Sequence, residues 1–122
     1  MDRIVFVGSA PGNHPPEKSP TRRRITKWMD ELGVDRFKWK LTNVFLTKTT
    51  RTKLEGIETQ EFMQRLRGYK KIIALGNIPS DQMKRLDIQH LKVPHPSGLN
   101  RMWNDPELEP KVINDIKGYL QT

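Results

Sequence analysis

Residues 4–12, IVFVGSAPG, join an uninterrupted apolar run to a turn that contains glycine and proline. A short apolar run rich in β-branched side chains is typical of a strand that is buried on both faces, as in a parallel sheet. Gly8 ends the run, and prolines and glycines through Pro20 exclude a regular element there. The stretch therefore predicts an α/β fold in which a central strand leads directly into an irregular loop.

The rest of the chain repeats this alternation of strand and helix. Further strands are expected at residues 41–46, 70–77 and 90–93. Helices are expected to begin at good capping residues, namely Thr21, Thr59, Ser80 and Asp105 followed by Pro106. Their expected apolar positions are Ile25, Trp28, Met29 and Leu32, then Phe62, Met63 and Leu66, and finally Val112, Ile113, Ile116, Tyr119 and Leu120. The pattern predicts one domain, residues 1–122, with a three-layer α/β/α architecture around a small, mostly parallel four-stranded sheet.

Composition narrows the class of protein. The 122 residues contain no cysteine, which excludes disulfides and thiolate metal sites and favours a reducing intracellular compartment. The apolar runs are far shorter than the roughly 20 residues of a membrane span, and no secretory signal follows Met1. We therefore expect an intracellular protein that does not enter membranes.

Charge points to a polyanionic partner. Lys and Arg number 22 against 14 Asp and Glu, a net charge of +8, and the isoelectric point is about 10.0. A basic surface without a specific partner is the simpler explanation, but so large an excess on a small domain favours nucleic acid. Residues 47–56, TKTTRTKLEG, are expected to be an exposed basic loop.

The carboxyl ends of the expected strands carry the unusual residues. In open α/β sheets ligands bind at this edge, and the segments expected there are 8–14, 43–48, 76–77 and 95–101. The turn after Gly8 is either an ordinary turn or a ligand loop, and it lacks the Gly-Lys-Ser/Thr ending of a phosphate-binding P-loop. Asn43, within an apolar strand, either bonds to nearby backbone or presents its amide to a ligand. His95 is either an ordinary loop residue or a directed one, since Pro94 and Pro96 restrict its backbone.

Two other kinds of site are not expected. His14, His90 and His95 lack ligand spacing and have no cysteine beside them, so no metal site is predicted. No Gly-x-Ser-x-Gly motif supports a Ser-His-Asp hydrolase.

Four segments, taken in order, resemble the landmarks of the uracil-DNA glycosylase superfamily. They are VGSAPG at 7–12, LTNV at 41–44, IIALGN at 72–77 and HPSGLNR at 95–101. The last is the most specific, because the His-Pro-Ser-x-Leu pattern is matched at His95, Pro96, Ser97 and Leu99. The chain is shorter than typical members, with trimmed connections.

The resemblance implies roles for individual residues. His95 would donate a hydrogen bond to uracil O2 as charge grows on the departing base, and Asn43 would recognise the uracil edge. The loop of Gly8, Ser9, Ala10, Pro11 and Gly12 would line the base pocket. Contacts to DNA are expected from Ser97, Gly98, Leu99, Asn100, Arg101, Lys48 and Arg51, with Leu99 as a wedge in the gap left by the flipped base. The implied partner is uracil-containing DNA, bound by a monomer without metal or organic cofactor.

The first motif departs from the family pattern. Ser9 and Ala10 occupy positions where many members carry Asp, Glu or Asn to orient water or stabilise the sugar cation. Asn13 or His14, in the same loop, are the candidates for positioning water instead. Residues 13–27 hold no Phe, Tyr or Trp to stack on the base, and residues 47–54 hold no histidine for the covalent chemistry of one branch.

Three functions therefore remain open. The leading hypothesis is a small glycosylase acting on uracil or a related deaminated base, either a stand-alone repair enzyme or a virus-encoded one. The second is a non-catalytic DNA-binding protein of the same fold, and the third is a protein that recognises bases or nucleotides in RNA or free in solution. Retained Asn43 and His95 favour the first, whereas Ser9 and Ala10 favour the second.

Overall fold

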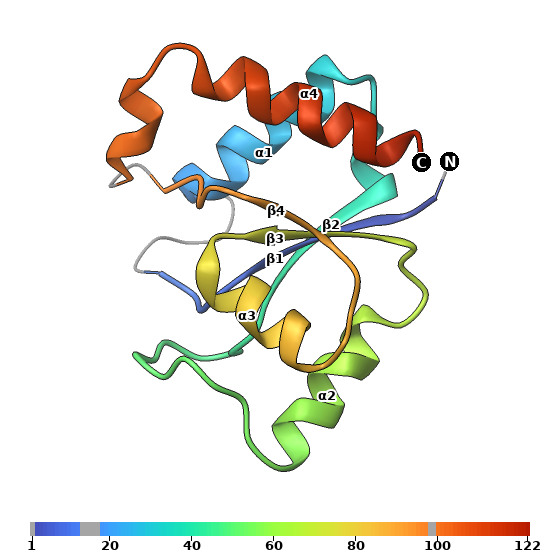
Figure 1. Ribbon diagram of the computed structural model, residues 1–122, viewed down its shortest axis with the longest axis vertical. Coiled ribbons are helices and arrows are strands. Elements are labelled where there is room, and N and C mark those ends of the chain that lie inside the picture. Colours follow the sequence, from blue (N-terminus) through green and yellow to red (C-terminus); the bar gives the residue numbers. More distant parts are fainter. Residues whose placement is uncertain (1, 13–17, 98–99) are drawn as a thin grey trace.

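A computed structural model describes residues 2–12, 18–97 and 100–122. Its centre is a four-stranded sheet with the order β2-β1-β3-β4, in which every pair of neighbours is parallel (Figure 1). The strands are β1 (Ile4–Gly8), β2 (Trp39–Asn43), β3 (Lys71–Leu75) and β4 (Leu91–Val93). The expected small sheet is thus confirmed, and it is parallel throughout.

Helices cover both faces of the sheet (Figure 1). They are α1 (Pro20–Glu31), α2 (Ile57–Leu66), α3 (Asn77–Arg85) and α4 (Leu108–Leu120), with short 3-10 helices η2 (Arg36–Lys38) and η3 (Arg101–Asn104). Helices α1 and α4 lie on one face and α2 and α3 on the other. This confirms the three-layer α/β/α architecture predicted from the alternation of elements.

The central strand β1 explains the apolar run at the start of the chain. Ile4 and Phe6 belong to one core cluster, with side chains from α1 and α4, whereas Val5 and Val7 belong to the other, with α2 and α3. All four side chains are at most 1% exposed. A strand packed on both faces has no polar face, so the alternation of apolar and polar residues is absent.

The second strand lies earlier in the sequence than expected. It spans residues 39–43, not 41–46, because Ile4 pairs with Trp39 and Gly8 with Asn43. Val44 and Phe45 are buried but lie beyond the strand. Their apolar character, which suggested strand residues, reflects packing of the following loop on the core.

The first and last helices also begin at residues other than those expected. The Ser19 side chain, not Thr21, caps α1 by accepting a hydrogen bond from the backbone of Arg22. Pro20 then takes the first helical position, where its missing N–H costs nothing. Helix α4 begins at Leu108 rather than after Asp105, whose side chain instead accepts a hydrogen bond from Glu107 N (2.9 Å) in the turn before the helix.

Glycines with positive φ set the starts of the two remaining helices. Gly56, with φ of 56°, precedes α2, and Gly76, with φ of 94°, precedes α3. Thr59 and Ser80, expected as caps, therefore lie inside these helices. Met63, expected on the apolar face of α2, is 45% exposed. Over the residues placed in the structure, no helix is long and apolar enough to cross a membrane.

Candidate functional site

The carboxyl edge of the sheet combines two glycines with two polar side chains. The central strands β1 and β3 lead into Gly8 and Gly76, whereas the outer strands β2 and β4 lead into Asn43 and His95. Each polar residue thus borders the glycine of its inner neighbour. The arrangement follows from the strand order, since the carboxyl ends of parallel strands meet at one edge.

The Asn43 side chain lies against Gly8. The two residues are paired in the sheet, and a Cβ atom added to Gly8 would lie 2.5 Å from Asn43 Oδ1. Beyond the strands the two chains stay together, because Val44 N donates to Gly8 O (2.9 Å) and Phe45 N to Ser9 O (2.9 Å). Asn43 is partly exposed rather than fully buried.

Arg65 of α2 supports the backbone at Asn43. Its Nη2 atom donates to Asn43 O (2.7 Å) and to Val44 O (3.1 Å). Burial against the protein lowers the pKa of Arg65. Sequence reasoning missed this residue, because a single arginine on a helix looks like one more surface cation.

The His95 side chain lies against Gly76. A Cβ atom added to Gly76 would lie 3.3 Å from His95 Cβ, and Gly76 N donates to Val93 O (2.8 Å). Desolvation lowers the pKa of His95 below its ordinary value of 6.5, so the imidazole is neutral near neutral pH. Neither ring nitrogen bonds to another residue in the described ranges, which leaves the ring available to a ligand.

The backbone of His95 is held by two side chains that follow it in sequence. Asn100 Nδ2 donates to His95 O (2.9 Å), and Trp103 Nε1 donates to the same oxygen (2.8 Å). Asn100 Oδ1 also accepts from Met102 N (3.1 Å), at the start of η3. The Trp103 ring also packs against the core cluster that contains side chains of α1 and α4.

The other predicted residues of the first motif surround Gly8. Ser9, Ala10 and Pro11 are half-buried, and Ala10 packs on the core cluster of α2 and α3. Gly12 is exposed, with no atom within 4 Å of an added Cβ. Asn13 and His14, the candidates for positioning water, lie outside the described residues.

The residues expected to contact DNA belong to the segments that follow β2 and β4 in the chain. Ser97 is half-buried, while Lys48 and Arg101 are exposed. Arg51 forms an ion pair with Glu58 (2.7 Å) and lies 5.2 Å from the centre of the Phe45 ring. Gly98 and Leu99, including the expected wedge, fall outside the residues that the structure describes.

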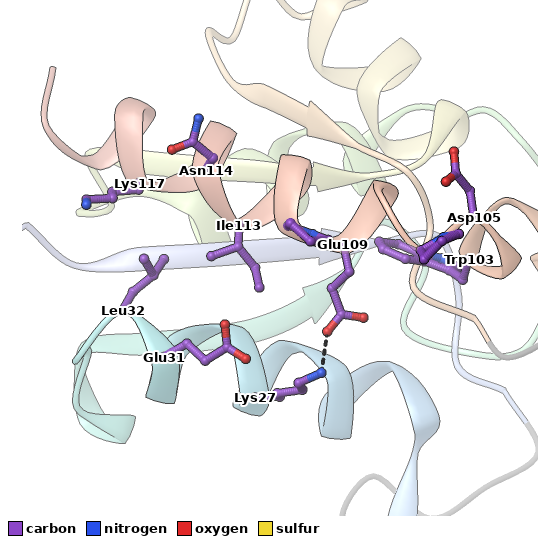
Figure 2. Close-up of a pocket in the computed structure, with 11 residues that line it drawn as sticks. Lys27, Glu31, Leu32, Trp103, Asp105, Glu109, Ile113, Asn114 and Lys117 are labelled. Carbon is purple, nitrogen blue, oxygen red and sulfur yellow. Dashed lines mark hydrogen bonds and ion pairs between the residues drawn. The ribbon is translucent and has the colours of Figure 1, made fainter.

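A groove elsewhere on the molecule does not involve the predicted site. It has a volume of about 650 Å³ and lies between α1 and α4 (Figure 2). Glu109 joins the two helices across it, through Lys27 Nζ (2.7 Å) and Arg24 Nη1 (2.6 Å). Trp103 lies at one end. Within the described ranges, no group of three or more His, Asp or Glu side chains is placed to hold a metal ion.

The fold and this edge define a class of protein: a doubly covered parallel α/β sheet that presents an amide and a neutral imidazole at the carboxyl ends of its strands. The family model described as the uracil DNA glycosylase superfamily matches residues 1–117. The chain belongs to the uracil-DNA glycosylase superfamily. A search of curated proteins finds no match.

Proposed function

We propose that the protein is a glycosylase that hydrolyses the N-glycosidic bond of uracil, or of a related deaminated base, in DNA after flipping the nucleotide out of the duplex. Membership of the superfamily supports a glycosylase-like function of this kind. The observation that carries the proposal is the approach of Asn43 and His95 to the glycines of the two central strands, at one edge of the sheet. A base bound over this edge meets both side chains.

Asn43 supplies recognition of the base. A carboxamide carries a donor and an acceptor side by side, which complements the O4 acceptor and N3–H donor of uracil. Cytosine presents the opposite pattern at the corresponding position, so it leaves both groups unpaired, and unpaired polar groups in a desolvated site are costly. The glycine at position 8 makes room for this amide, and Arg65 fixes the peptide that carries it.

His95 stabilises the leaving group. As the bond between C1′ and N1 breaks, its electron pair passes to the base, and a neutral imidazole N–H donates to the O2 atom on which charge accumulates. Water then adds to C1′ and loses a proton, which completes hydrolysis. The lowered pKa of His95 suits this role, because the ring donates a hydrogen bond without first holding a full positive charge.

Water activation differs from that of members with an acid in the first motif. Ser9 and Ala10 supply no carboxylate, so stabilisation of the departing base by His95 carries a larger share of the rate enhancement, with Asn13 or His14 proposed to position water. The same feature favours one alternative, a DNA-binding protein of this fold that does not cleave.

The proposal is tested by base release from uracil-containing single- and double-stranded oligonucleotides, detected as strand cleavage after alkali. Asn43→Ala and His95→Ala are each expected to lower the rate by about 10²- to 10³-fold, as for loss of an oxyanion donor. Asn104→Ala, which removes an exposed amide from η3, is the control and retains the wild-type rate. Salt-sensitive DNA binding without cleavage by the wild type assigns the protein to the binding class instead. Stronger binding of RNA or of free nucleotides than of DNA identifies the protein as one that recognises bases or nucleotides outside DNA.

A further inference from the structure

The carbonyl oxygen of His95 accepts two side-chain hydrogen bonds. Asn100 Nδ2 and Trp103 Nε1 lie 2.9 and 2.8 Å from it. A carbonyl oxygen has two lone pairs, so these donors satisfy it fully. The prolines on either side of His95 carry no backbone N–H and give this segment no donors of their own. Side-chain donors thus satisfy the His95 carbonyl, whereas within a sheet a backbone N–H of the neighbouring strand would do so.

Trp103 itself contacts two side chains of α1. Its ring packs against that of Trp28, with centroids 5.6 Å apart, and the Arg24 guanidinium lies 4.5 Å from its centre. Arg24 is in turn paired with Glu109 of α4. In Figure 2 the indole closes one end of the groove between α1 and α4. The donor of the second hydrogen bond therefore packs on α1 and is linked to α4 through Arg24.

We propose that Trp103, together with Asn100, is a positioning residue that sets the direction of the His95 ring by fixing the peptide between His95 and Pro96. The inference rests on the proposed function, because the ring must meet a specific atom of the base. Orienting the peptide plane orients the Cα–Cβ bond that carries the imidazole. A misplacement of about 1 Å at a reacting centre costs on the order of 10²-fold in rate.

The first test is Trp103→Phe, which keeps an aromatic ring in the core but removes the N–H donor. The matched control is Trp39→Phe, which truncates an indole at the amino end of β2, away from the site, whose buried Nε1 has no partner within the described part of the chain. Trp103→Phe is expected to slow single-turnover uracil release by about 10- to 100-fold. Its DNA dissociation constant is expected to stay within about twofold of the wild-type value, and Trp39→Phe is expected to keep the wild-type rate. Equal rates for the two variants overturn the proposal.

A second variant tests the inference if Trp103→Phe does not fold. Asn100→Ser removes the Nδ2 donor, while the serine hydroxyl still caps the backbone N–H of Met102 at the start of η3. We expect a slower single-turnover rate at saturating enzyme, a condition under which a change in DNA affinity does not affect the rate. If the two donors act as a unit, the double variant is slower by less than the product of the single effects. A wild-type rate for Asn100→Ser in a folded protein overturns the joint role.

The positioning role of Trp103 and Asn100 and the proposed function are tested separately. If the wild type releases no base, the proposed function fails, and the positioning role is tested by nuclear magnetic resonance of the His95 ring. Trp103→Phe and Asn100→Ser are then expected to shift the His95 ring signals and their titration midpoint, whereas Trp39→Phe leaves both near the wild-type values. Unchanged His95 signals in both Trp103→Phe and Asn100→Ser overturn the inference, whatever the activity of the protein.

Discussion

Gly8 shows what a missing side chain contributes to the site. It has no positive φ, so alanine suits its backbone, but the new methyl group would lie 2.5 Å from Asn43 Oδ1. We expect Gly8→Ala to displace the amide and slow uracil release by about 10- to 100-fold. Gly118→Ala, in α4 and with no atom within 4 Å of an added Cβ, is the control and is expected to leave the rate unchanged. Equal rates for the two variants in the base-release assay would contradict the placement of Asn43.

His95 is expected to make both activity and stability depend on pH. Burial lowers its pKa below 6.5 in the folded protein, whereas the unfolded chain keeps the ordinary value. The unfolded state therefore takes up a proton first as pH falls, so the free energy of unfolding decreases from 6.5 down to the folded pKa and then levels off. Uracil release declines only at the lower end of this window, when the folded ring becomes charged.

The measurement combines urea unfolding with base-release rates between about pH 5 and pH 8. The matched variant, His95→Gln, has no titrating ring, so its stability is expected to lose this part of the pH dependence. If wild type and His95→Gln show the same slope, the ring is not desolvated in the folded state.

At the scale of elements, α2 and the end of β2 are joined by Arg65. Its contacts with Asn43 O and Val44 O connect residues 22 and 21 positions apart. Arg65→Met removes the donor from both carbonyls, and we expect unfolding by urea to become easier by about 1–2 kcal/mol. Arg67→Met makes the same chemical change at an exposed position just beyond α2 and is expected to cost less than half as much. Equal losses would mean that the carbonyl contacts contribute little.

At the scale of the whole molecule, the charge of +8 is expected to govern affinity for DNA. Each phosphate contact releases condensed counterions, so the logarithm of the binding constant falls linearly with the logarithm of salt concentration. Arg101→Gln, beside the His95 segment, is expected to reduce that slope by about 1. Lys70→Gln, at the amino end of β3 and thus at the opposite edge of the sheet, loses the same charge and is expected to change the slope little. A larger effect at Lys70 would move the DNA surface away from the proposed site.

The α/β architecture was predictable because its signals are local. A strand buried on both faces is a short apolar run, and glycine marks its end, so β1 and β3 were expected within a residue or two of their observed bounds. The edge that gathers Asn43 and His95 then follows from parallel topology alone. Local signals failed where tertiary packing determined the structure. Val44 and Phe45 are apolar because a loop packs on the core. Helices α2 and α3 begin directly after glycines rather than at Thr59 and Ser80.

By itself the sequence determined the order of the elements and indicated Asn43 and His95 as the candidate site residues, since both properties depend on residue type and spacing along the chain. Only the tertiary structure decided what holds those residues. Arg65 reaches the Asn43 backbone from another helix, and Trp103 reaches the His95 carbonyl while anchored on α1 and α4. A hydrogen bond to a backbone oxygen needs no particular residue at the acceptor, so it leaves no pattern in the sequence and appears only when the folded chain brings donor and carbonyl together.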